Sequence, residues 1–173
     1  MKKRGFTLVE LLVTLAIGAI LLVIAIPGYA FLASSSKLAA ATNDLVSSLQ
    51  MARSEAVKRR MRVTVCKSRS TGSASPACDP SAEWRDGWLI FVDGGTRGIV
   101  DADDTVLRVR QRLFATITIT SNNFSSFISY RPNGVSQGQN GLGNGTLSVC
   151  VGNSQRDIIV NMTGRPRLHH TFC

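Results

Sequence analysis

The chain has 173 residues, of which 44% are hydrophobic, and it carries a formal net charge of +9. This length is enough for one domain plus a membrane anchor. The four cysteines show neither a CxxC pair nor a Cys/His spacing typical of metal ligands, which argues against a zinc site. His169 and His170 have no plausible nucleophile or carboxylate partner nearby in the sequence, so we expect a binding protein without catalytic residues, metal or cofactor.

The N-terminal part combines basic residues with a long apolar run. Lys2, Lys3 and Arg4 precede Leu11–Ser36, which is 26 residues without a charged side chain. As a helix this run would be roughly 39 Å long, enough to cross a hydrocarbon core of about 30 Å. Basic residues before a membrane helix hold that end in the cytoplasm, so we expect the rest of the chain on the other side of the membrane.

The residues just before the apolar run are more specific than the run itself. A secretory signal peptide has a shorter apolar core that is followed by a small-residue cleavage site. Here Gly5 comes before the run, and Phe-Thr-Leu-Val-Glu follows it, ending at Glu10. This order closely resembles the type III signal of type IV pilins and pseudopilins.

The resemblance implies how the chain is processed and assembled. In that family prepilin peptidase cuts after the glycine, here Gly5, and the new first residue, here Phe6, is N-methylated. Glu10 would neutralise the N-terminal ammonium of a neighbouring pilin subunit in the helical filament. A carboxylate costs about 2.5–3.5 kcal/mol at the bilayer centre, which favours a functional residue. The alternative is a boundary carboxylate stabilised by the helix dipole.

Three segments follow from this resemblance. We expect a cleaved leader over residues 1–5, a transmembrane and filament-core helix over residues 6–33, and a globular periplasmic head over residues 34–173. The protein would lie in the bacterial inner membrane as a single-pass protein and then move to the pilus at the cell surface. Pro27–Gly28 interrupts the apolar helix, as in pilins whose helix is locally unwound in the filament, and a simple kink is the alternative.

The head begins with an amphipathic second half of the helix, which we place over Lys37–Met61. From Arg62 onward the hydrophobic period changes to two, which is typical of strands. One long helix followed by antiparallel strands is an α+β layout, and it matches the type IV pilin fold that the resemblance implies. The helix stripe that should pack on the sheet is Leu38, Ala41, Leu45, Leu49, Ala52 and Ala56. The expected strands are Arg62–Cys66, Gly87–Val92, Thr105–Arg112, Thr116–Ser121, Phe127–Arg131, Thr146–Val151 and Arg156–Met162.

All four cysteines follow the apolar segment, on the side where an oxidising compartment permits disulfides. Four cysteines allow three pairings. We favour Cys66 with Cys78, which have 11 residues between them, and Cys150 with Cys173, which would tie down the C-terminus.

The segments Trp84–Asp93 and Asp101–Arg108 narrow the family. They resemble the FimT/GspH group of minor pilins and pseudopilins, in which a Trp-containing strand leads through an Asp/Gly-rich loop to a Leu-Arg strand. The aspartates of this loop also suit calcium, since hard cations bind carboxylate oxygens. Their spacing is not that of an EF-hand, and Asp is common in Gly-rich turns, so we favour a turn without metal.

The C-terminal third is basic, with seven arginines and one acid, Asp157, after Thr105. The planar fork of Arg suits bidentate contacts with phosphate. Arg108, Arg110 and Arg112 alternate along one expected strand and therefore share a face. That face is either part of a DNA-binding surface or a solvated strand face.

The segment Gly164-Arg165-Pro166-Arg167 carries the sharpest functional signal. Pro166 favours an extended Arg165 and lacks a donor for a sheet, so we expect an edge or a tail. In an extended chain the two arginines point the same way, about 7 Å apart, and Gly164 permits a sharp turn. The segment resembles the GRxR motif of FimT-type pilins, which bind DNA during natural transformation.

The sequence therefore predicts a minor type IV pilin that binds DNA largely independently of base sequence. The alternative is a structural minor pilin or a type II secretion pseudopilin that primes filament assembly without binding DNA. The residues expected to bind DNA are Gly164, Arg165, Arg167, Arg108, Arg110 and Arg112.

Overall fold

The computed structural model describes residues 7–173. Gly5 and Phe6, where we expect cleavage and methylation, lie outside the described residues. The chain divides into two compact units, residues 1–36 and 37–173. The second unit begins three residues after the start that we expect for the head.

Helix α1 runs over Leu8–Arg59. Its first part, up to Ser36, exposes its large apolar side chains and is long and apolar enough to cross a membrane. The helix continues through Pro27–Gly28, so the local unwinding that the resemblance places in the filament is absent from α1 in this structure.

Glu10 caps the start of α1. Its Oε2 accepts hydrogen bonds from the backbone N–H and the hydroxyl of Thr7, both at 2.9 Å. The Thr7 hydroxyl oxygen accepts a bond from the Glu10 N–H at 3.3 Å, which completes a capping box. The Thr-Leu-Val-Glu order therefore has a local structural role, in addition to the assembly role that the resemblance implies for Glu10.

The second part of α1 buries the predicted stripe. Leu45, Leu49, Ala52 and Ala56 are fully buried, and the remaining two members of the stripe are nearly so, which confirms the expected period. Arg60 follows the helix in the left-handed conformation (φ 56°), so α1 ends slightly before the expected Met61.

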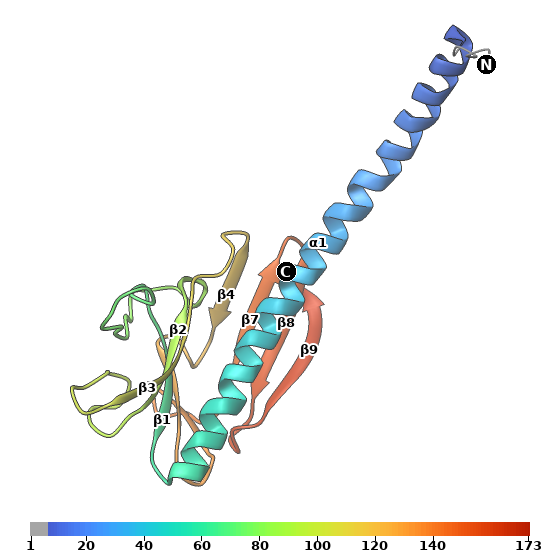
Figure 1. Ribbon diagram of the computed structural model, residues 1–173. Helices are drawn as coiled ribbons and strands as arrows, with labels where there is room; N and C mark the ends of the chain where they lie inside the picture. The colour runs from blue at the N-terminus through green and yellow to red at the C-terminus, as the bar shows by residue number, and fades with distance from the viewer. Residues whose placement is uncertain (1–6) are drawn as a thin grey trace. The chain divides into compact units, whose positions relative to one another are not determined.

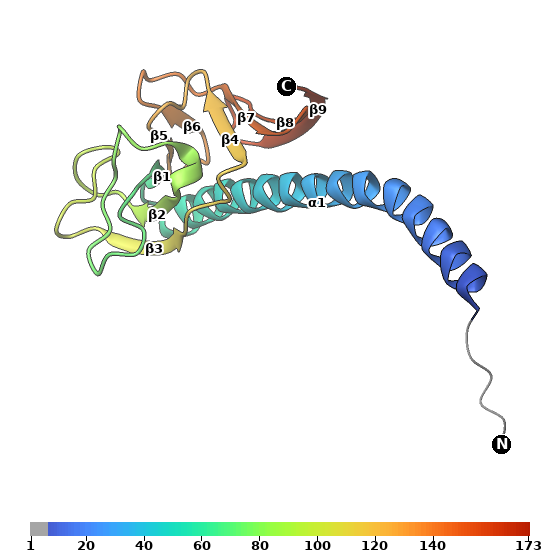
Figure 2. The same cartoon turned by 90° about the horizontal axis from the view of Figure 1, so that it is seen from above.

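Two antiparallel sheets lie on the same side of this part of α1 (Figures 1 and 2). The first has the strand order β3-β2-β1-β5-β6 and the second has the order β4-β7-β8-β9. The strands of the first sheet are β1 (Val63–Lys67), β2 (Trp88–Val92), β3 (Thr105–Arg110), β5 (Phe127–Tyr130) and β6 (Ser136–Gly138). Those of the second are β4 (Ile117–Ser121), β7 (Gly145–Val151), β8 (Ser154–Val160) and β9 (Pro166–Phe172).

These sheets confirm the predicted α+β class and shift most strand ends by a residue or two. Two strands and a single 3-10 turn, η1 (Trp84–Asp86), were not predicted. Strand β6 is short, polar and contains glycine, so it gives no hydrophobic alternation. Strand β9 is mostly exposed and contains a proline, an arginine and two histidines among its seven residues, so it gives no clear hydrophobic alternation, and only an edge or tail was expected.

The main core lies between α1 and the sheets, and two tryptophans form hydrogen bonds within it. Trp88 Nε1 donates to the Ser48 hydroxyl of α1 at 2.9 Å, and Trp84 Nε1 donates to the Phe124 carbonyl at 2.9 Å. Strand β2 is buried on both faces because Leu89 packs in a second, smaller core on the far face of the first sheet. A central strand of this kind shows no alternation in burial.

Both disulfides have the pairing that we favoured from the sequence, Cys66–Cys78 and Cys150–Cys173. The second joins the end of the chain, just after β9, to β7 two strands away. Because β9 is an edge strand, this covalent link holds it to the sheet.

The helix stripe makes a stability prediction. Leu49→Ala removes a fully buried side chain, so we expect the free energy of unfolding of residues 34–173 to fall by about 2–5 kcal/mol in urea. Val57→Ala, which truncates a side chain with 48% exposure on the same helix, serves as the control and should change it by less than about 1 kcal/mol. Equal effects of the two substitutions would contradict this packing.

Candidate nucleic-acid interface

The Gly-Arg-Pro-Arg segment belongs to the turn between β8 and β9, here called the arginine turn (residues 161–167). The Gly164 N–H donates to the Asn161 carbonyl at 2.8 Å. The Asn161 side-chain oxygen accepts from the Arg165 N–H at 2.9 Å and from the Thr163 hydroxyl at 2.8 Å. An Asn that bonds the backbone beyond it is a common way to fix a turn. The turn therefore carries its own local bonding.

Gly164 holds this turn against the neighbouring β5–β6 hairpin. It is buried and has a φ of +76°, which favours glycine. A Cβ at this position would lie 2.2 Å from the Gly134 carbonyl oxygen and 3.0 Å from a ring carbon of Tyr130. Tyr130 is itself fully buried, and burial raises the pKa of its hydroxyl. The glycine of the motif thus permits close packing, whereas the arginines face solvent.

Arg53 of α1 forms hydrogen bonds to the arginine turn and to the β5–β6 hairpin. Its Nε donates to the Gly134 carbonyl at 3.1 Å and to the Thr163 carbonyl at 3.3 Å. Sequence analysis missed this residue because its partners lie 81 and 110 residues away, and no local pattern marks it. One guanidinium therefore ties the helix, the β5–β6 hairpin and the arginine turn together.

Arg165 and Arg167 are exposed, and neither forms an ion pair within residues 7–173. Arg167 is the second residue of β9 and lies opposite Ile159 of β8, while Arg165 precedes the strand. Pro166 begins β9 at the edge of its sheet, which is the edge position expected from the sequence. These two cations are available to an anionic partner.

The arginines of β3 have a different environment. Arg110 forms an ion pair with Asp44 of α1, and Arg112, beyond the end of β3, lies 3.5 Å from an oxygen of Asp86. Arg108 is exposed. Arg108 and Arg110 lie on β3, the edge strand of the first sheet, and Arg112 follows it, so the structure does not gather these arginines into one turn with Arg165 and Arg167.

The aspartates of the 93–104 loop organise the backbone. Asp93 is buried, and its carboxylate accepts bonds from Arg62 at 2.6 Å, from the Thr64 hydroxyl at 2.6 Å and from the Gly98 N–H at 2.9 Å. Asp101 and Asp104 likewise accept bonds from backbone N–H groups of the loop. Carboxylates with these partners fit the turn interpretation that we favoured over a calcium site.

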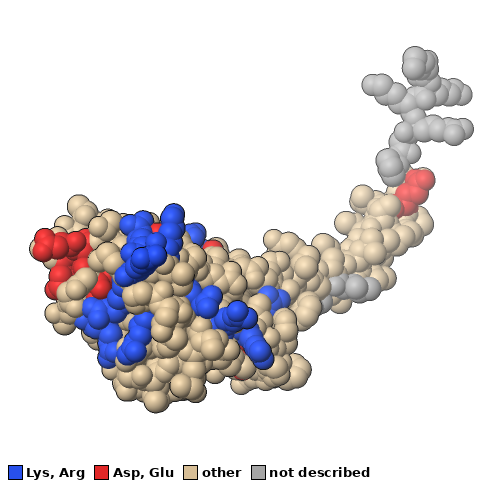
Figure 3. All heavy atoms as spheres, turned by 90° about the horizontal axis from the view of Figure 1, so that it is seen from below, with Lys and Arg blue, Asp and Glu red and all other residues tan. Residues whose placement is uncertain are grey.

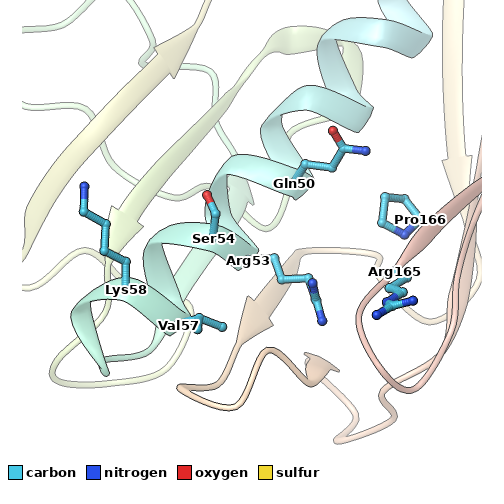
Figure 4. A pocket seen from close by; sticks show the side chains of 7 residues that line it. All are labelled: Gln50, Arg53, Ser54, Val57, Lys58, Arg165 and Pro166. Atoms are coloured by element: carbon cyan, nitrogen blue, oxygen red, sulfur yellow. The ribbon is translucent and has the colours of Figure 1, made fainter.

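A groove of about 640 Å³ separates α1 from the start of β9, and Figure 4 shows its lining side chains. Gln50 points toward Pro166, and Arg53 extends toward Arg165 (Figure 4). The residues that line the groove are Gln50, Arg53, Ser54, Val57, Lys58, Arg165 and Pro166.

Charged side chains are unevenly distributed over the head. Figure 3 shows Lys and Arg side chains in groups on the face seen from below, while Asp and Glu gather at one end of it.

Comparison with known families matches both parts of the chain. The model described as type II transport protein GspH matches residues 41–164. The chain belongs to the GspH family. The prokaryotic N-terminal methylation motif matches residues 1–26 of this GspH-family protein, so it is a type IV minor pilin or pseudopilin of the FimT/GspH kind, as the sequence predicts.

Solved structures share the fold of this GspH-family protein. The type IV minor pilin FimU of Pseudomonas aeruginosa, in one crystal form, superposes with a TM-score of 0.59 at 21% identity, covering 78% of this chain and 90% of FimU. A second crystal form gives a TM-score of 0.55 at 22% identity over 75% and 90%. The curated proteins contain no match. The type IV pilin fold expected from the sequence is therefore confirmed.

The packing of Gly164 can be tested against a matched glycine. Gly152 also has a positive φ, +59°, but a Cβ there would meet nothing within 4 Å. We expect Gly164→Ala to lower the free energy of unfolding by about 1–3 kcal/mol more than Gly152→Ala, because only the former adds a clash to the backbone cost. Urea unfolding of both variants measures the difference, and equal losses would show that Gly164 is not closely packed.

Proposed function

We propose that this GspH-family protein is a minor pilin that binds DNA at the arginine turn and serves uptake in natural transformation. The observation that carries the proposal is the environment of Arg165 and Arg167. Both are exposed without an ion-pair partner among residues 7–173, on a turn that Gly164 and Arg53 fix in place. Two free guanidinium groups on a turn whose backbone is fixed suit bidentate contact with phosphates.

Phosphate contacts determine how DNA binding depends on base sequence and on salt. Phosphate contacts position a protein on DNA but do not read its sequence, so binding is largely sequence-independent. It weakens steeply with salt, because each contact releases a condensed counterion. Of the three arginines at the edge of the first sheet, Arg110 and Arg112 already lie close to carboxylates, and Arg108 belongs to a different sheet from β9, so the proposal rests on the arginine turn.

The N-terminal part carries the processing signal and the membrane anchor of the protein. We propose that prepilin peptidase removes residues 1–5, that residues 6–33 span the inner membrane, and that the head, residues 34–173, lies in the periplasm before it enters the pilus. The apolar, exposed first part of α1 supports this arrangement, as does the methylation-motif match. Glu10 then has a partner in the filament, the N-terminal ammonium of a neighbouring subunit, in place of Thr7.

A second candidate function is favoured by the family match itself, since its model describes a type II transport protein. In this alternative the protein is a pseudopilin or a structural minor pilin, and its basic face meets a neighbouring subunit. Neighbouring genes for secretion rather than for pili and competence would favour it.

A DNA titration separates the two candidates. Residues 34–173 are titrated with a labelled duplex at several salt concentrations, as wild type and with Arg165→Ala plus Arg167→Ala. We expect the double variant to bind about tenfold or more weakly, with a slope of log affinity against log salt that is smaller by about 2. The control, Arg69→Ala plus Arg85→Ala, removes the same charge from arginines that already have carboxylate partners. If both double variants bind like the wild type, the arginine turn is not the site.

A further inference from the structure

We propose that the groove between α1 and the arginine turn holds one unstacked base of a single-stranded nucleic acid, while Arg165 and Lys58 contact the flanking phosphates. This inference rests on the proposed function and deepens it, because it names the form of DNA that the site prefers. It makes the groove a site for a base, in addition to the phosphate contacts of the arginine turn.

The shape of the groove suits one nucleotide better than a duplex. One wall is a stripe of α1 from Gln50 to Lys58, about 12 Å along the helix axis, and the other is Arg165–Pro166. The volume of about 640 Å³ lies within the range of small-molecule sites. Bases of a duplex are stacked inside it, and bringing one out costs a few kcal/mol. A single strand does not pay this cost in full, so it enters more readily.

The walls offer the surfaces that a base needs. Val57 is 48% exposed and, with the ring of Pro166, supplies apolar area against which a base can pack. The Arg165 guanidinium is a flat surface of the kind on which unstacked bases lie. The Ser54 hydroxyl donates to the Met51 carbonyl at 2.8 Å, which leaves its oxygen to accept a bond from a base edge, and Gln50 offers both a donor and an acceptor.

The charge of the groove favours a polyanion as its occupant. Lys58 and Arg165 lie on either side of Ser54 in Figure 4, and Arg53 extends between them. Glu55 is the acid next to this stripe, and Arg59 binds it at 2.5 Å, with Lys58 at 3.8 Å. The Lys58 contact is long and its side chain is 77% exposed, so Lys58 can turn to a phosphate at little cost. The groove therefore combines cations with the apolar area of Val57 and Pro166, which suits a base and its flanking phosphates.

The test fills the groove without changing its charge. The full chain in a non-ionic detergent is titrated with a labelled oligo-dT strand, an abasic strand of equal length and a blunt duplex, as wild type and as Ser54→Leu. The control is Ser47→Leu, since Ser47 is exposed on the same helix and also donates to the carbonyl three residues before it. We expect Ser54→Leu to weaken oligo-dT binding about tenfold and to leave duplex binding within about twofold. The control Ser47→Leu should bind oligo-dT like the wild type. Wild type should bind the abasic strand about tenfold less tightly than oligo-dT.

Other results overturn the inference in distinct ways. If Ser54→Leu leaves oligo-dT binding unchanged while Arg165→Ala plus Arg167→Ala weakens binding of the duplex, the groove is not a base site and the proposed function stands. Equal affinity for abasic and normal strands leads to the same conclusion. If the full chain binds no DNA form, the proposed function fails together with the inference. Displacement of oligo-dT by an acidic peptide at lower concentration than by unlabelled strand would assign the groove to a protein partner.

Discussion

The buried stripe of α1 is the constraint on which the rest of the head depends. Leu45, Leu49 and Ala52 are fully buried, and small residues at Ala52 and Ala56 let the sheets approach the helix closely. The next residue, Arg53, lies beside this buried face, and the packing of the core fixes its backbone. A single side chain at the border of the core can therefore position a turn that is more than a hundred residues away in sequence.

This dependence changes what the Gly-Arg-Pro-Arg segment means physically. Packing alone accounts for a glycine at position 164, because the Gly134 carbonyl oxygen leaves no room for a Cβ. Pro166 likewise fits an edge strand, where a missing N–H costs no sheet hydrogen bond. The two arginines are the part of the segment that packing does not explain. These side chains are exposed and form no ion pair among residues 7–173, so they add little to stability and are free to bind an anion.

Local patterns in the sequence predicted much of this protein, and non-local contacts account for the rest. The helix stripe and most strands followed from hydrophobic period, and the edge position of β9 followed from Pro166. The bond from Arg53 to Thr163 and the ion pair of Arg110 with Asp44 join residues 110 and 66 positions apart, so no sequence window contains both partners. The Arg110 pair shows why alternation along β3 did not identify free cations. By contrast, the capping box of Thr7 and Glu10 was visible in the sequence as Thr-x-x-Glu, but Glu10 was interpreted as an assembly residue or as a carboxylate stabilised by the helix dipole.

In the proposed function the N-terminal part brings the protein to the membrane and the pilus, and the arginine turn binds DNA. The most direct test is to count pili and measure DNA uptake in the native bacterium carrying Arg165→Ala with Arg167→Ala. The account predicts normal numbers of pili and a strong fall in uptake, because the substituted side chains are exposed and neither packs in the core. Normal uptake, or a loss of pili that accounts for the fall in uptake, would contradict it.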